Sequence, residues 1–168
     1  MGTKERVAGG LEKLARMVPG IESYQDKEAL RDADKRLRQT FADRLDGAAR
    51  RLGRIILKIQ REGRLEHLDL VGRLERWLQG TADTIRFASY GYSGFFAAVK
   101  MDEKNIRRLY EFDVGLADAV DVILDRVGRL EEIDRIKEEH LGELEADISA
   151  LENQIRERMV LFRADPPQ

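Results

Sequence analysis

The longest apolar periodicity in this 168-residue chain lies in its first half and contains no proline. Its members recur every three or four residues: Leu30, Ala33, Leu37, Phe41, Leu45, Ala48, Leu52, Ile55 and Ile59. This spacing places one apolar stripe along one face of an α-helix. At a rise of 1.5 Å per residue, a helix over residues 26–62 is about 55 Å long. The fold must therefore cover an apolar stripe of this length.

Both ends of this predicted helix carry suitable residues. Asp26 and Glu28 lie at its start, where the helix dipole favours negative charge. Gly63 lies just beyond its end, where glycine commonly terminates a helix.

The same spacing predicts shorter helices on either side. Residues 4–18 form an amphipathic pattern that ends at Pro19. Residues 65–79 form a second pattern, after which we expect Gly80 to interrupt the helix and Thr81 to cap a further helix over residues 81–88. Because no strand-like alternation occurs, the sequence predicts an all-α fold.

The last predicted helix starts near Asp102 and carries two heptad seams. The first seam is Leu116, Val120, Ile123, Val127 and Leu130, and the second is Leu141, Leu144, Ile148, Leu151, Ile155 and Phe162. Polar Asp134 and Lys137 separate the two seams, and such residues either fix a coiled-coil register or mark a bend. A continuous helix over residues 102–163 is about 90 Å long and overhangs the first helix. The overhang must pack on a folded-back part of its own chain, after a break near Gly142, or on a second chain.

These patterns predict an antiparallel helical bundle over residues 1–130 and an acidic extension of a long, coiled-coil-like last helix over residues 131–168. The charged fraction of 37 % and the aromatic fraction of 7 % are typical of long amphipathic helices. The chain has no cysteine, which excludes disulfides and thiolate metal sites. No apolar run approaches a membrane span, and the N-terminus lacks the pattern of a signal peptide, so we expect a cytoplasmic protein.

The second seam is a candidate interaction surface. If residues 131–163 extend away from the bundle, Leu141, Leu144, Ile148 and Leu151 form an exposed apolar stripe that a second copy would cover. We therefore expect a homo-oligomer that also binds another protein.

Two segments carry opposite charge. Residues 131–157 contain ten acidic and three basic residues, a net charge of −7. Residues 47–61 contain five basic residues and no acid, and four of these share one helix face: Arg50, Arg54, Lys58 and Arg61.

Three interpretations of these charges stay open. The charged faces are solvated and carry surface salt bridges of at most about 1 kcal/mol each. Alternatively, the basic and acidic helices attract each other within or between chains, so that salt weakens their association. A third interpretation is an anionic partner of the basic face, either lipid or nucleic acid. Nucleic acid is the less favoured of the two, because no recognition motif occurs and the stacking aromatics of single-strand binders are not interleaved with the arginines. Helix 4–18 could join such a membrane contact or dock on the bundle.

The aromatic stretch over residues 87–101 differs from the rest of the chain. Tyr90, Tyr92, Phe95 and Phe96 surround Gly91 and Gly94 within it. Packing at the end of the bundle is the first interpretation, because the glycines allow tight turns and the rings bury large surfaces. Binding of a ligand or peptide over residues 87–96, or catalysis there, is the alternative.

Motifs of enzyme chemistry are missing from the sequence. The Glu-x-x-His pairs of carboxylate-bridged metal bundles do not occur, because Arg64 and Lys137 lie three residues before His67 and His140. The sequence contains no phosphate-binding loop, nucleophile elbow or dinucleotide fingerprint. We therefore expect no metal, no cofactor and no catalytic residue, and a non-catalytic scaffold or adaptor as the function.

Two segments resemble motifs in a family of uncharacterised bacterial all-helical proteins. They are VPGIESYQDKEALRDADKRLR, residues 18–38, and YGYSGFFAAVKMDEKNIRRLYEFD, residues 90–113. The resemblance implies a bacterial source and an all-α fold for about the first two thirds of the chain. It implies no activity and no site residue.

Truncation of Phe96 tests whether the aromatic stretch is structural. A buried phenylalanine that is replaced by alanine lowers the free energy of unfolding by about 3 kcal/mol. We expect this loss in denaturant melts of Phe96→Ala or Phe95→Ala, because we expect at least one of the two rings to be buried, Phe96 before Phe95. Losses below about 0.5 kcal/mol in both variants would instead indicate rings that are displayed for a partner.

Overall fold

Long α-helices make up nearly all of the described chain. The structure is a computed structural model that describes residues 10, 12–17, 27–88 and 103–161. Residues 12–17 are helical, and the long helices are α2 (Lys27–Arg61), α3 (Leu68–Phe87), α5 (Glu103–Glu132) and α6 (Glu138–Leu161). Within these ranges there is no strand, so the predicted all-α class is confirmed.

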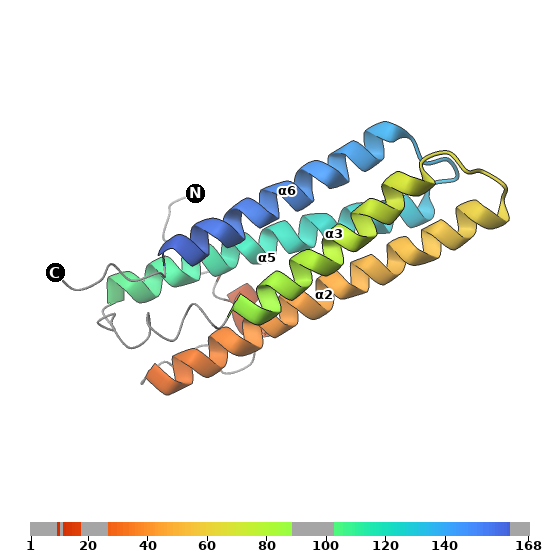
Figure 1. The fold of residues 1–168 in the computed structure, drawn as a ribbon. Coiled ribbons are helices and arrows are strands. Elements are labelled where there is room, and N and C mark those ends of the chain that lie inside the picture. Colours follow the sequence, from red (N-terminus) through yellow and green to blue (C-terminus); the bar gives the residue numbers. More distant parts are fainter. Residues whose placement is uncertain (1–9, 11, 18–26, 89–102, 162–168) are drawn as a thin grey trace.

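The long helices form two antiparallel hairpins that pack side by side (Figure 1). α2 and α3 make one hairpin, and α5 and α6 make the other. α2 packs against α5, and α3 packs against α6, which closes the four into a bundle. Consequently α2 and α6 occupy opposite corners of the bundle, along the lower and upper edges of Figure 1.

Helix α2 ends where the sequence predicts. Gly63 adopts a left-handed φ of 66°, which an L side chain would disfavour. The backbone N–H of Gly63 donates to the carbonyl of Gln60 at 3.1 Å, and that of Arg64 donates to the carbonyl of Ile59 at 3.1 Å. These two bonds are a Schellman motif, which satisfies the last carbonyls of α2.

Gly80 does not interrupt the second helix, so the predicted division into helices 65–79 and 81–88 is wrong. α3 starts at Leu68, and it continues through Gly80 to Phe87. Thr81 is buried inside it and does not cap a new helix: its hydroxyl hydrogen-bonds the carbonyl of Trp77 at 2.9 Å and Glu152 Oε1 of α6 at 3.2 Å. A helical glycine costs about 1 kcal/mol, and burial of the apolar stripe on both sides of Gly80 outweighs it.

The chain reverses between α5 and α6, so the predicted extension of one last helix beyond residue 131 is wrong over residues 138–161, the described part of that segment after the reversal. Of the two possibilities that the sequence leaves open, the structure shows the folded-back one (Figure 1). The reversal lies at residues 133–137, where the seam is polar, rather than at Gly142, which lies within α6. The backbone N–H of Lys137 donates to Nδ1 of His140 at 3.3 Å, which satisfies one free amide at the start of α6.

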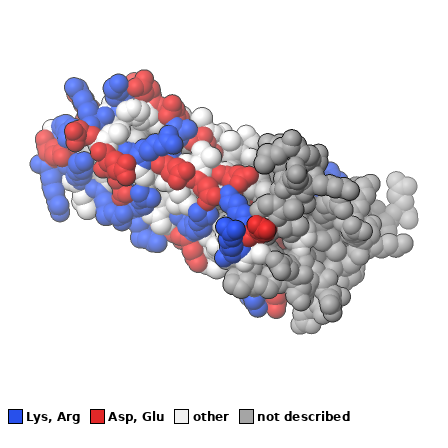
Figure 2. Space-filling model, turned by 180° about the vertical axis from the view of Figure 1, so that it is seen from behind, with Lys and Arg blue, Asp and Glu red and all other residues white. Residues whose placement is uncertain are grey.

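Charged side chains of both signs cover the described surface. Figure 2 shows them interspersed along the face seen from behind Figure 1. Many form ion pairs between helices, such as Arg44 of α2 with Asp121 of α5 at 2.5 Å.

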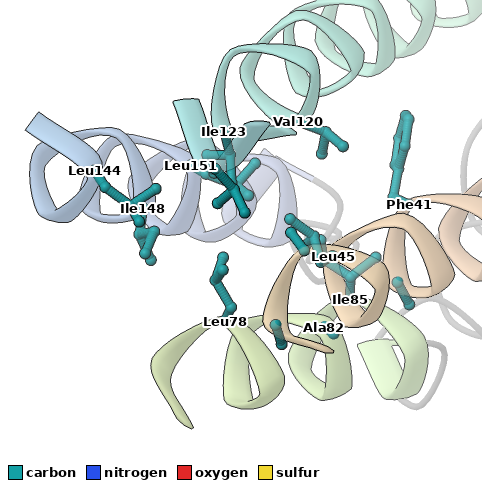
Figure 3. Close-up of a cluster of buried hydrophobic side chains, with 14 of the residues drawn as sticks. Phe41, Leu45, Leu78, Ala82, Ile85, Val120, Ile123, Leu144, Ile148 and Leu151 are labelled. Atoms are coloured by element: carbon teal, nitrogen blue, oxygen red, sulfur yellow. The ribbon is translucent and has the colours of Figure 1, made fainter. Parts of the chain in front are cut away.

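The core lies between the two hairpins and receives side chains from every long helix. Figure 3 draws 14 of these buried residues, and it labels Phe41, Leu45, Leu78, Ala82, Ile85, Val120, Ile123, Leu144, Ile148 and Leu151. The second seam of the sequence is therefore the inward face of α6 over residues 141–155, where the same chain buries its leucines and isoleucines. Phe162, the last seam residue, lies outside the described residues.

The N-terminal helix docks on α5 within its described part. Leu14 is fully buried, and Lys13 Nζ lies 2.6 Å from Asp118 Oδ1 and 2.5 Å from Asp121 Oδ2. Gly10 lies so close to α5 that a Cβ atom there would be 2.7 Å from a methyl group of Val114. Of the two alternatives for helix 4–18, docking on the bundle or contact with a membrane, residues 12–17 show the docked one.

Replacement of Leu144 by alanine tests the folded-back position of α6. Because Leu144 is fully buried, Leu144→Ala should lower the free energy of unfolding by 2–5 kcal/mol, about what buried leucines lose. Val160→Ala, at an exposed position of the same helix, is the control and should change it by less than about 0.5 kcal/mol. Urea melts in 0.5 M salt, which screens contacts between charged faces, should agree at two protein concentrations, because the burial is within one chain. A midpoint that rises with concentration would indicate that a second chain covers the seam.

Candidate functional site

Four charged side chains are buried together at the end of the bundle where α2 and α5 begin and α6 ends. They are Asp34 and Arg38 of α2, Asp113 of α5 and Arg158 of α6, and each is at most 6 % exposed. We call this group the buried ionic network. Charged residues are rarely buried without partners, so the network is the most unusual chemical feature of the described interior.

Arg158 joins three helices within the network. Its Nε donates to Asp113 Oδ1 at 2.8 Å, and one of its terminal nitrogens donates to Asp34 Oδ1 at 2.7 Å. The second contact crosses the diagonal of the bundle, from α6 to α2. A planar guanidinium can hold two carboxylates in fixed directions, which a lysine ammonium cannot do as well.

Arg38 connects the network to the last turn of α3. Its Nε donates to Asp34 Oδ2 at 2.9 Å, four residues earlier on the same helix. A terminal nitrogen donates to the backbone carbonyl of Arg86 at 3.2 Å. Cations near the C-terminal carbonyls of a helix are favourable because the helix dipole is negative there. All four long helices are therefore tied together at this end.

Burial changes the acidity of Asp113. Desolvation raises the pKa of Asp113 from 3.8 to about 6, because the lowering effect of Arg158 is only partial and Asp34 adds a further raising effect. The pKa of Tyr110, one turn earlier on α5, is raised by desolvation and by the charge of Asp113. Burial of the charged form of Asp113 therefore costs desolvation free energy, and protonation of Asp113 removes this cost.

The network has a structural role in the described chain, because it joins side chains of α2, α5 and α6. Its guanidinium groups are of the kind that bind carboxylates, and here they hold the protein's own carboxylates. Buried ion pairs contribute little net stability, because desolvation offsets their attraction, but they can specify one packing arrangement. In this bundle they fix the position of α6 against α2 and α5.

The sequence analysis missed these four residues, although a signal is present. Asp113 continues the seam of α5 one step before Leu116, and Arg158 continues the seam of α6 one step after Ile155. Charged residues at seam positions of two helices indicate ionic partners across a core. The positions of charged residues in the seams do not show which helices face each other.

The basic segment of α2 lies on the outside of the bundle. We call the exposed surface of Arg50, Arg54, Leu57, Lys58 and Arg61 the basic face. It points away from the core, since Ile55 and Ile59 on the opposite side of the helix are buried. Leu57 lies at the centre of the basic face and is 52 % exposed. No ion pair joins Arg50, Lys58 or Arg61 to any residue that the structure describes, so the face carries uncompensated positive charge.

The two oppositely charged segments meet within the chain at one residue. Glu131 of α5 accepts hydrogen bonds from Arg51 at 2.7 Å and from Arg54 at 2.9 Å. Partial burial alone would raise the pKa of Glu131, but the two arginines outweigh it and hold that pKa below its usual value. Gly128 leaves room for this contact, because a Cβ atom there would lie 3.1 Å from the Arg51 guanidinium.

A shallow depression opens to solvent at the other end of the bundle. Its lining includes the apolar side chains of Ile55, Ile59 and Ile133. Arg64 donates to the carbonyl of Asp134 at 2.6 Å, and this bond ties the α2–α3 connection to the α5–α6 connection. Because the charges at its rim largely pair with each other, the depression does not favour one charged ligand.

The other candidate residues fall into two groups. Leu141, Leu144, Ile148 and Leu151 are buried in the core, so they are not available on the surface of this fold. Tyr90, Tyr92, Phe95 and Phe96 lie outside the described residues. In the described ranges, no three acidic or histidine side chains form a group that could hold a metal ion, and no helix is long and apolar enough to cross a membrane.

Comparison of the chain with protein-family models, with curated proteins and with solved structures found no match. The resemblance of residues 18–38 and 90–113 to a bacterial family therefore stays a prediction.

Replacement of Asp113 by asparagine tests the electrostatics of the network. Between pH 3.8 and about 6 the folded chain binds more protons at Asp113 than the unfolded chain, so this group adds stability as the pH falls through that range. Asparagine cannot titrate. The free energy of unfolding of the parent should therefore rise relative to that of Asp113→Asn, by about 2 kcal/mol from pH 7 to pH 4.5.

Urea melts of both proteins at the two pH values measure this difference. Asp121 and Glu131, whose pKa values are lowered by their basic partners, are present in both chains and cancel. Asp125→Asn, at an exposed position of the same helix, is the matched control. A difference that stays constant within about 0.5 kcal/mol would contradict the raised pKa.

Proposed function

We propose that this protein is a non-catalytic helical scaffold or adaptor, and that it binds an acidic segment of another protein chain on the basic face of α2. The observation that supports this function is the uncompensated charge of that face around an exposed leucine. Arg50, Lys58 and Arg61 have no ionic partner among the described residues, and Leu57 lies between them.

The shape of the basic face suits a protein segment better than a small molecule. From Arg50 to Arg61 the helix rises by about 16 Å, and the exposed side chains lie along this line, although Lys58 also borders the shallow depression. Small-molecule sites are concave, whereas an amphipathic helix can lie along an extended surface. The cations would steer an acidic segment to the face, and Leu57 would supply an apolar contact.

A peripheral membrane protein is the alternative function. Basic residues attract anionic lipids at about 1 kcal/mol each near the surface. The docked position of residues 12–17 argues against a membrane contact by helix 4–18, because Leu14 is buried and Lys13 is paired with acidic residues of α5. The basic face alone would then make the contact. A cytoplasmic location suits both functions.

A ligand-binding or enzymatic role of the aromatic stretch is a further alternative. Phe87, the last residue of α3, is 62 % exposed, and it belongs to the stretch over residues 87–96. An exposed ring beside the connection to α5 is compatible with a binding surface there. The remaining rings lie outside the described residues, so this alternative rests on the sequence.

Charge reversal on the basic face tests the proposed function. The probe is a synthetic helical peptide with glutamates on one side and leucines on the other, and its lysine counterpart is the negative probe. Arg50→Glu with Arg61→Glu should weaken binding of the acidic peptide by more than about tenfold, since 1.4 kcal/mol corresponds to a factor of ten. Leu57→Ala should weaken it by a smaller factor. Fluorescence anisotropy at physiological salt measures both.

The matched control reverses two arginines elsewhere. Arg36→Glu with Arg73→Glu changes the net charge by the same amount at exposed positions of α2 and α3. This variant should bind the acidic peptide as the parent does. Equal losses in both double variants would show a general charge effect and contradict the proposal. Flotation with phosphatidylserine vesicles, in the absence of peptide binding, would favour the membrane alternative.

A further inference from the structure

The outward surface of α6 is acidic and lies at the opposite corner of the bundle from α2. Five exposed residues follow one line along this helix at steps of four, three, four and seven: Glu139, Glu143, Ala146, Ala150 and Glu157. We call this line the acidic face. Residues at these steps share one side of a helix, and this side is turned away from the buried seam of Leu144, Ile148 and Leu151.

The acidic face keeps negative charge after its ion pairs are counted. Glu157 has no ion pair with any residue in the described ranges. Glu143 pairs with Arg126 and Glu139 pairs with Lys137, yet their side chains remain 59 % and 65 % exposed. Arg126 also pairs with Asp147, so two acids share one base. The middle of the face carries only the small side chains of Ala146 and Ala150, which allow another helix to approach closely.

We propose that the basic face of α2 docks on the acidic face of α6 in a second copy of this chain. This inference rests on the proposed function, because it names the partner of the same surface. The two faces complement each other in charge and in shape. One has an exposed leucine between cations, and the other has two alanines between carboxylates.

The spacing of the residues fits an antiparallel contact between the helices. Leu57 lies seven residues after Arg50, and Ala150 lies seven residues before Glu157. Both intervals correspond to about 10 Å along a helix. When Leu57 lies on Ala150, Arg50 therefore lies beside Glu157. Arg61 then lies about one turn from Glu143, within reach of its long side chain.

The positions of the two faces determine the type of assembly. Since α2 and α6 occupy opposite corners of the bundle, the basic and acidic faces point in different directions (Figure 1). One copy cannot use both faces on the same neighbour. The contact is therefore heterologous, and repetition of it adds further copies unless the rotation closes a ring. The protein should consequently grow beyond a dimer as its concentration rises.

Sedimentation velocity over a range of concentration and salt tests this inference. The parent should show a weight-average sedimentation coefficient that rises with concentration at low salt, and it should approach a monomer at 0.5 M salt. Arg50→Glu with Arg61→Glu should stay monomeric at low salt. Glu143→Lys with Glu157→Lys should also stay monomeric, and Arg126 keeps Asp147 as a partner in that variant.

Two further variants separate a specific contact from general attraction. Ala150→Trp changes no charge at an exposed position, but it blocks the centre of the acidic face and should abolish association. Arg36→Glu with Arg73→Glu should associate as the parent does. A thermal melt of each variant confirms that it is folded.

Each failure points to a different conclusion. A parent that is monomeric at every salt concentration overturns the inference, and so does association that persists in Arg50→Glu with Arg61→Glu or in Ala150→Trp. If the parent stays monomeric but its basic face still binds the acidic peptide, the proposed function stands and only the second copy is excluded as partner.

Discussion

The contact of Arg158 with Asp34 and Asp113 is the constraint on which the arrangement of the bundle depends. Apolar seams can slide along each other by a turn at modest cost, because leucines and isoleucines are nearly interchangeable in a core. A buried guanidinium allows no such slip, because any shift would leave a charge without a partner in the interior. One residue of α6 thereby fixes that helix against α2 and α5, and Arg38 extends the same network to the end of α3.

Folding back of α6 decides which surfaces are left for function. The apolar seam of α6 is buried within the chain, so its side chains are not exposed for the interface of an obligate dimer. The outward surfaces that remain are charged, and they differ from helix to helix. Opposed charged faces give contacts that are sensitive to salt, in contrast to the salt-insensitive burial of an apolar seam. An adaptor that assembles and releases reversibly would use contacts of this kind.

The interior and the surface of this protein use the same residue types in different ways. In the network, two arginines hold buried carboxylates, and the cost of desolvation raises the pKa of Asp113. On the basic face, arginines remain solvated, and their charge is available to a partner. Arg51 and Arg54 are intermediate, because they share Glu131 at the boundary between the two environments. Glycine contributes at this boundary, where Gly128 leaves room for the Arg51 guanidinium.

The sequence by itself determined the all-α class, the end of α2 and the buried sides of the helices, because helix periodicity and the Gly63 stop are local properties. It also indicated the outward position of the basic residues of α2. It did not determine that Gly80 is tolerated, because the burial that outweighs this glycine comes from other helices. Only the tertiary structure decided that α6 folds back and that Asp34, Arg38, Asp113 and Arg158 meet, since these residues are up to 124 positions apart in the chain. The physical reason is that an apolar stripe shows which side of a helix must be buried. Which other helix buries it depends on packing and charge pairing over the whole chain.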